Sequence, residues 1–135
     1  MRLSFIRNCL IIAAVILVGC ATTKKDTRMD ALSITADKYQ SAIRWGLYDI
    51  ADNLREAGGV IDNSTIERLK KIKVTEYKSI HKDVSKDGTE AKYVIEIKYY
   101  NIDYMLEKTL IDKQVWKYDP EKKAWSLQSG LPEFK

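Results

Sequence analysis

The stretch Ala91-Lys92-Tyr93-Val94-Ile95-Glu96-Ile97-Lys98-Tyr99 alternates with a period of two residues. Its odd-numbered positions are apolar or aromatic, and three of its four even-numbered positions are charged. Such alternation predicts a β-strand with one buried face and one solvated face. A strand of this kind belongs to an antiparallel sheet that packs on one side only. We therefore expect neighbouring strands and a covering helix elsewhere in the chain.

A long strand is predicted to precede this stretch, over residues 72–84. Its apolar positions also alternate, but Tyr77 and Ile80 fall on opposite faces, and this slip predicts a β-bulge or a bend. The polar residues 85–88 then form a turn in which Gly88 supplies a positive φ angle. The two strands are therefore expected to form a hairpin.

Two further strands are predicted after it. Residues 101–103 are expected to form a turn. A third strand is predicted from about Leu106 to Tyr118, and its residues Leu106, Leu110, Trp116 and Tyr118 all lie on one face. A polar loop over residues 119–123 leads to a fourth strand, which contains Trp125 and Leu127. All these connections are short, as expected of antiparallel neighbours.

The covering helix is predicted over residues 31–57, where apolar residues recur at steps of three and four. Gly58-Gly59 is expected to end it with a left-handed turn. Gly46 is expected inside it, at a close approach of another backbone, because glycine otherwise costs about 1 kcal/mol there relative to alanine. A second, short helix that reaches about Leu69 is predicted, with Asn63 or Ser64 as its N-cap and Glu67 as the capping-box partner. The apolar stripe of the long helix comprises Leu32, Ala36, Tyr39, Ile43, Leu47, Ile50, Leu54 and Ala57.

These elements predict an α+β fold. A long N-terminal amphipathic helix is expected to pack on a strongly bent antiparallel sheet of three to four or more strands. Bending the sheet over the helix would bury the apolar face of each.

The N-terminus has the three parts of an export signal. Arg2 and Arg7 are basic, residues 9–18 are uninterruptedly apolar, and Gly19-Cys20 follows. The apolar run is about half of the roughly 20 residues that a membrane-spanning helix needs. Leu17-Val18-Gly19-Cys20 resembles the bacterial lipobox, and the weaker alternative is a hydrophobic N-terminal helix with an incidental cysteine.

The lipobox implies cleavage after Gly19 and attachment of lipid to Cys20. Two or three acyl chains, such as palmitate, would anchor the chain durably, because each buried methylene contributes about 0.8 kcal/mol. Residues 1–19 are then a signal peptide, 20–30 the lipidated cysteine and a flexible tether, and 31–135 the domain. Ala21 follows the cysteine, and in lipoproteins of this kind a residue other than Asp favours the periplasmic face of the outer membrane.

Composition excludes several kinds of site. Cleavage removes 19 of 135 residues with two arginines and leaves 21 basic and 19 acidic residues, so the formal charge falls from +4 to +2. Basic residues are scattered and form no stripe, which argues against nucleic-acid binding. Cys9 is removed and Cys20 carries lipid, so the domain has no disulfide. One histidine, His81, excludes a multi-histidine metal site, and we expect no metal and no cofactor.

Four segments of the chain resemble a family of uncharacterised proteobacterial lipoproteins: residues 43–46 (Ile-Arg-Trp-Gly), 109–114 (Thr-Leu-Ile-Asp-Lys-Gln), 116–119 (Trp-Lys-Tyr-Asp) and 129–134 (Ser-Gly-Leu-Pro-Glu-Phe). The order of the elements resembles the NTF2-like fold, a cone that SnoaL- and ketosteroid-isomerase-like proteins share. The resemblance implies an interior pocket, and it implies no activity.

NTF2-like enzymes place an Asp, or a His–Asp pair, beside tyrosines in this pocket. The pocket candidates are Tyr39, Trp45, His81, Tyr93, Tyr99 and Asp103. His81 is more often a surface histidine at such a position, and Asp49 and Asp52 are expected to face solvent. The eight tyrosines and three tryptophans suit either a small aromatic core, which we favour, or a carbohydrate or peptide site.

Two functions remain open. The first is a non-catalytic binding or assembly module, anchored to the membrane through its N-terminal lipid, whose partner is a protein or a small apolar ligand. The second is an isomerase- or dehydratase-type enzyme that uses the cone pocket. A homodimer through the sheet is compatible with either, and no catalytic residue is assigned.

Overall fold

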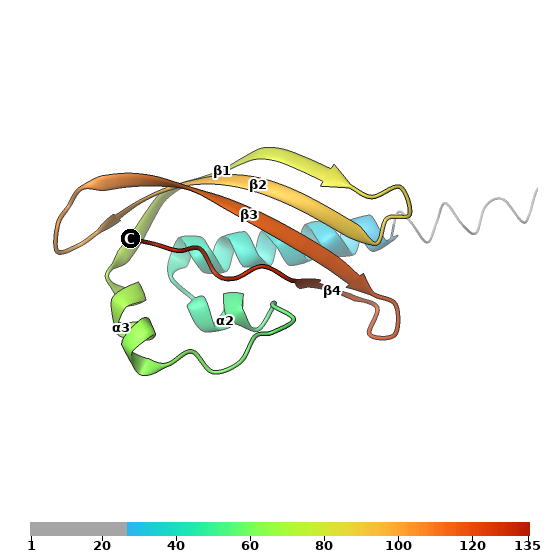
Figure 1. Cartoon of the computed structure of the whole chain (residues 1–135), viewed down its shortest axis with the longest axis horizontal. Coiled ribbons are helices and arrows are strands. Elements are labelled where there is room, and N and C mark those ends of the chain that lie inside the picture. Colours follow the sequence, from blue (N-terminus) through green and yellow to red (C-terminus); the bar gives the residue numbers. More distant parts are fainter. Residues whose placement is uncertain (1–26) are drawn as a thin grey trace, which may run out of the picture.

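The computed structural model describes residues 27–135 of the chain. It is an α+β fold in which four antiparallel strands form one open sheet in the order β1-β2-β3-β4, with the helices on one face (Figure 1). Residues 27–45 are helical. The remaining elements are α2 (Tyr48–Asp52), α3 (Asn63–Lys70), β1 (Ile72–Val84), β2 (Glu90–Asn101), β3 (Glu107–Asp119) and β4 (Ala124–Leu127).

The alternating stretch lies in β2, between β1 and β3 in the sheet. Its side chains Ala91, Tyr93, Ile95, Ile97 and Tyr99 are all buried, which confirms the predicted phase. Its charged residues alternate with these buried side chains and therefore lie on the face away from the helices. Both edges of β2 are paired, with β1 and with β3. The predicted meander of four strands is confirmed, with each boundary within a few residues of the expected one.

β1 has two register shifts, between Val74 and Glu76 and between Ser79 and His81. The second lies at the predicted slip between Tyr77 and Ile80. The following turn has Gly88 at a φ of 67°, and the hydroxyl of Ser85 accepts hydrogen bonds from the Thr89 and Glu90 amides. The predicted positive φ at Gly88 is therefore confirmed.

The expected continuous helix over residues 31–57 is wrong. Gly46 has a φ of 70°, and its amide bonds to the Ile43 carbonyl while the Leu47 amide bonds to the Ala42 carbonyl at 2.8 Å. This pair of bonds is a Schellman motif, which ends a helix at a left-handed glycine. The chain then reverses into α2, so Leu47 and Ile50 are exposed rather than in a buried stripe.

Gly58 does not end a helix either. A Cβ atom on Gly58 would lie 2.0 Å from the Asp52 carbonyl oxygen, so glycine is required there by close approach. Asp52, which we expected in solvent, is buried. Its carboxylate accepts hydrogen bonds from Arg55 Nη1 at 2.5 Å and from the Gly59 amide at 2.8 Å. Similarly, the cap of α3 is Asp62, and not Asn63 or Ser64.

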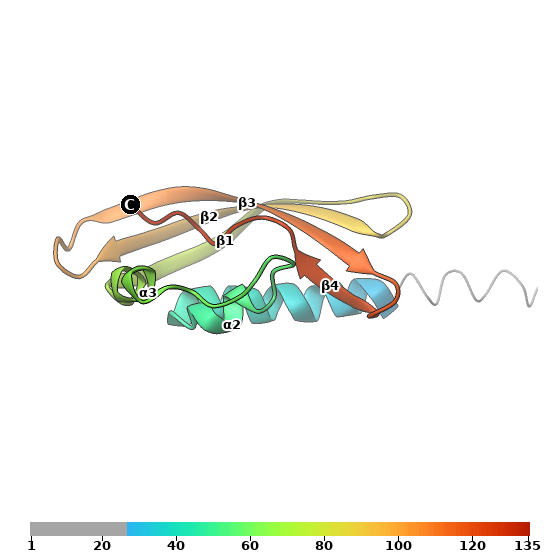
Figure 2. The same ribbon diagram turned by 60° about the horizontal axis from the view of Figure 1, so that its bottom comes forward.

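The core lies between the sheet and the helical residues 27–45, which Figure 2 shows as two layers. Tyr39 packs edge-on against Trp116 of β3 with ring centroids 5.7 Å apart. Trp125 of β4 donates a hydrogen bond to the Arg28 carbonyl at 2.8 Å. Residues 27–30, which we expected in the tether, are thus helical and packed on the domain.

The helix enters the domain at the end that carries the β1–β2 and β3–β4 turns, and the β2–β3 hairpin lies at the opposite end (Figures 1 and 2). The predicted signal peptide and Cys20 lie outside the described residues. Within residues 27–135, no helix is long and apolar enough to cross a membrane.

Candidate functional site

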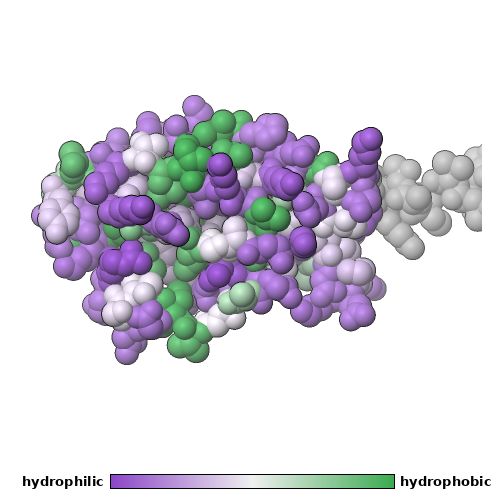
Figure 3. Space-filling model, in the orientation of Figure 1, coloured by the Kyte–Doolittle hydropathy of each residue, from purple (hydrophilic) through white to green (hydrophobic). Residues whose placement is uncertain are grey.

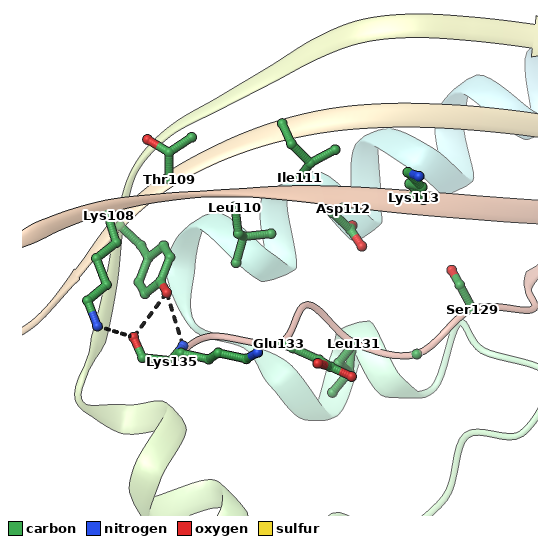
Figure 4. A pocket seen from close by; sticks show the side chains of 12 residues that line it. Lys108, Thr109, Leu110, Ile111, Asp112, Lys113, Ser129, Leu131, Glu133 and Lys135 are labelled. Atoms are coloured by element: carbon green, nitrogen blue, oxygen red, sulfur yellow. Dashed lines mark hydrogen bonds between the residues drawn. The ribbon is translucent and has the colours of Figure 1, made fainter.

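A cleft of about 720 Å³ lies between β3 and the C-terminal segment, residues 128–135 (Figure 4). One wall is formed by residues 108–113 of β3, and the other by Ser129, Gly130, Leu131, Glu133 and Lys135. In Figure 4 the side chains of Lys108, Leu110 and Asp112 point toward the C-terminal segment, whereas those of Thr109 and Ile111 point away. The segment therefore lies on the helix-facing side of β3.

Phe134 holds the C-terminal segment in this place. Its buried ring packs edge-on against Tyr99 and Tyr48, with centroids 4.9 and 6.2 Å away. The Tyr99 hydroxyl donates to the Lys135 carbonyl and accepts from the Lys135 amide, both at 3.0 Å. Lys108 Nζ donates to the same carbonyl at 2.9 Å. The cleft thus has two fixed walls.

The edge of β3 along this cleft has no strand partner within residues 27–135. β4 pairs only with residues 116–119 of β3, and the last bond of the C-terminal segment to β3 runs from the Gln128 amide to the Val115 carbonyl at 2.7 Å. The Tyr118 amide bonds toward the β2 side, to Thr89. Because these directions alternate along a strand, the backbone groups of Thr109, Ile111 and Lys113 point to the free edge.

The outer edge of β1 and the free edge of β3 differ in regularity. β1 has two bulges, and bulges protect an edge against unwanted pairing because they twist it away. By contrast, β3 pairs with β2 over residues 107–117 without a register shift. Its free edge is therefore regular enough to accept another extended chain.

Asp112 is the buried carboxylate of the cleft, with 7% of its surface exposed. Gln114 Nε2 donates to its Oδ2 at 2.7 Å and to the Tyr77 hydroxyl at 2.8 Å. Gln114 Oε1 in turn accepts from Trp116 Nε1. Burial raises the pKa of Asp112, and the hydrogen bond from Gln114 opposes this rise. Among the described residues, no Lys or Arg forms an ion pair with Asp112.

Two further buried hydroxyl groups near the cleft have no hydrogen-bond partner in the described part of the chain. The Tyr39 hydroxyl and Ser129 Oγ are buried and have no hydrogen-bond partner among residues 27–135. Burial, and then the charge of Asp112, raise the pKa of Tyr39. Ser129 lines the cleft opposite Asp112. A ligand that donates a hydrogen bond or carries a positive charge could therefore pair with Asp112 on one wall of the cleft and with Ser129 on the other.

The structure brings only one of the six pocket candidates, Tyr99, to the cleft. Tyr39 and Tyr93 are buried in the core, and Trp45 is 78% exposed at the end of its helix. His81 is exposed on β1, opposite Val94. Asp103 lies in the β2–β3 turn, where it pairs with Lys71 at 2.6 Å.

The sequence did not single out Asp112, Gln114 or Tyr77. A signal was available, because Leu110, Trp116 and Tyr118 share a phase of the third strand and Asp112 and Gln114 occupy the same phase. Polar residues in a buried phase are the informative exception to hydrophobic burial.

Over residues 27–135 there is no group of three or more His, Cys, Asp or Glu side chains that could hold a metal ion. Comparisons of the chain with protein-family models, with curated proteins and with solved structures find no match.

Proposed function

We propose that this chain is a lipoprotein of the bacterial cell envelope whose domain binds an extended polypeptide along the free edge of β3. It is a binding or assembly module and not an enzyme. The observation that carries the proposal is the regular edge over residues 107–113, which has no strand partner among residues 27–135, with the backbone groups of Thr109, Ile111 and Lys113 directed outward.

Membrane attachment rests on the sequence Leu17-Val18-Gly19-Cys20 after a short apolar run. Lipid on Cys20 would hold the chain at the membrane, on the periplasmic face of the outer membrane given Ala21. The described domain begins at the end opposite the β2–β3 hairpin (Figure 1). A lipid at this side leaves the hairpin and the free edge of β3 accessible in the periplasm.

Strand addition suits this cleft better than an apolar ligand. Hydrophilic residues cover most of the face in Figure 3, and apolar residues occur there in separate groups. In strand addition, backbone hydrogen bonds supply the affinity, and pockets for alternate side chains supply the specificity. The unpaired edge of β3 offers the backbone hydrogen bonds. The cleft beside it, lined by Leu110, Asp112 and Ser129, offers a pocket for side chains.

We also propose that the domain has the NTF2-like fold. The order of elements supports this, because helical residues 27–45, α2 and α3 precede an antiparallel meander. A polar group of Tyr39, Tyr77, Asp112 and Gln114 lies between helix and sheet, at the place where such folds have their pocket.

Thiol labelling tests the occupied edge. The chain without added cysteine sets the background. Ile111→Cys should react at least several-fold more slowly with a thiol reagent in isolated envelopes than after purification and dilution, because an added strand would place its own side chains beside this one on the same face. Lys92→Cys, on the same face of β2, should react equally in both states. Equal rates for Ile111→Cys would contradict strand binding.

The second candidate function is a small-molecule isomerase or dehydratase. It is favoured by one observation, the raised pKa of Asp112 at the wall of the cleft beside buried tyrosines, because a general base works best with a pKa near the operating pH. Turnover that disappears in Asp112→Asn but persists in Asp103→Asn would select the enzyme.

A further inference from the structure

The free edge of β3 is complementary to itself. Residues 107–113 have the sequence Glu-Lys-Thr-Leu-Ile-Asp-Lys, with opposite charges at equal distances on either side of Leu110. We propose that the polypeptide bound at this edge is β3 of a second copy, paired antiparallel about a twofold axis through Leu110. This inference rests on the proposed strand binding and names its partner.

The hydrogen-bond directions fit this register. Thr109 of one copy lies opposite Ile111 of the other, and Glu107 lies opposite Lys113. All four residues direct their backbone groups to the free edge, so these are hydrogen-bonded pairs. Glu107 and Lys113 are exposed on the face away from the helices. Opposite charges directly across a pair of strands stabilise the pairing.

The helix-facing side of the same register completes the cleft. Leu110 meets Leu110 of the second copy, and Lys108 of the second copy lies opposite Asp112, in a pair whose side chains approach most closely. Asp112 has no cationic partner among the described residues of its own chain. Lys108 has three donor hydrogens, so it can keep its bond to Lys135.

Other registers lose these pairs. A slide of two residues one way places Asp112 opposite Leu110, and a slide of two the other way places Lys108 opposite Leu110. A slide of one residue places backbone N–H and C=O groups that face the free edge opposite residues of the second copy whose backbone groups face β2, so the hydrogen bonds between the strands cannot form. Charge therefore selects a single register.

An interface of seven residues per copy is small, and small interfaces are usually transient. Lipid anchors would confine both copies to one membrane and raise their effective concentration. A twofold axis along the membrane normal keeps both anchors at the same height. We therefore expect the dimer on the membrane and dissociation of the extracted chain upon dilution.

Cysteine cross-linking in envelopes tests the register with the full chain. Leu110→Cys lies on the axis and should form a disulfide-linked dimer under mild oxidation. Lys117→Cys, on the same strand but far from the axis, should cross-link at the background level of the chain without added cysteine. Absence of a Leu110→Cys dimer, with the domain shown to be folded by circular dichroism, would overturn the inference.

Charge reversal at the exposed pair gives a second test. In the Leu110→Cys background, Glu107→Lys alone or Lys113→Glu alone should lower the cross-linked fraction about tenfold, because two symmetry-related pairs become repulsive. The two reversals together should restore it to within twofold. A cross-link that is insensitive to both single reversals would overturn this register.

The two proposals fail differently. If Leu110→Cys does not cross-link but Ile111→Cys is protected in envelopes, another polypeptide occupies the edge, and only the second-copy inference is wrong. If Ile111→Cys is not protected, strand binding and the inference are both wrong.

Discussion

Replacing Asp112 by Asn should stabilise the isolated chain at pH 7. The carboxylate is 7% exposed, has no cationic partner in the described chain, and accepts a hydrogen bond from Gln114 at 2.7 Å. An asparagine oxygen can accept the same bond without the cost of burying a charge. A bond to a charged group contributes about 1.5–3 kcal/mol, whereas desolvating an ion costs several kcal/mol. We expect a net gain of about 1 kcal/mol in the free energy of unfolding.

The gain should depend on pH. Burial raises the pKa of Asp112 in the folded state above its ordinary value of 3.8, so the folded state binds this proton more tightly than the unfolded state. The contribution of Asp112 to the free energy of unfolding therefore falls as pH rises from about 4 through the folded-state pKa, and is constant above it. Asp112→Asn lacks this decrease, so the two proteins should converge near pH 4.

Urea denaturation of the full chain in detergent, at high dilution and at pH 4 and pH 7, measures the difference. Asp103→Asn is the control, because it removes an exposed ion pair with Lys71 and such pairs contribute about 0–1 kcal/mol. A loss of stability in Asp112→Asn at pH 7, or an unchanged pH dependence, would show that the carboxylate is compensated within its own chain.

Three other changes probe the fold and the anchor. Gly88→Val should lower the free energy of unfolding by about 1 kcal/mol or more, since φ is 67° there; an unchanged melting temperature would contradict the turn. Gly58→Ala should lower the free energy of unfolding by about 2 kcal/mol or more, because the added Cβ would lie 2.0 Å from the Asp52 carbonyl oxygen. Gly59→Ala is the control: its Cβ would meet no atom within 4 Å, so its melting temperature should be nearly unchanged. Cys20→Ser should leave an uncleaved precursor without lipid, and an unmodified mature N-terminus in the parent protein, found by mass spectrometry, would refute lipidation.

The strands were predictable because each has a local signal. The alternation of residues 91–99 fixes which side chains of β2 are buried, and the phase slip between Tyr77 and Ile80 locates a bulge of β1. The alternating apolar residues Trp125 and Leu127 likewise mark β4. Period-two patterns survive in the structure since each strand buries one face only.

The helix break was not predictable from periodicity. The apolar spacing continues through Leu47 and Ile50, and a glycine inside a helix looks the same in sequence as a glycine that ends one. The φ of 70° at Gly46 depends on the reversal into α2, which packing against the C-terminal segment stabilises through Tyr48 and Phe134.

The site was missed for a different reason. The predicted acid–base candidate was the lone histidine, but His81 is exposed on β1, and the buried carboxylate of the cleft is Asp112 in β3. The free edge itself depends on where the chain leaves the sheet after Gln128. No local pattern encodes that departure, because it follows from the anchoring of Phe134 in the core.

Residue-resolved hydrogen exchange measures directly whether a strand is added at the edge of β3. The amides of Thr109, Ile111 and Lys113 should exchange slowly in isolated envelopes and become fast after extraction and dilution. Those of Leu110 and Asp112, which point toward β2, should stay slow in both states. If the three edge amides exchange equally fast in both states, no strand is added to β3, and the proposed strand binding is wrong.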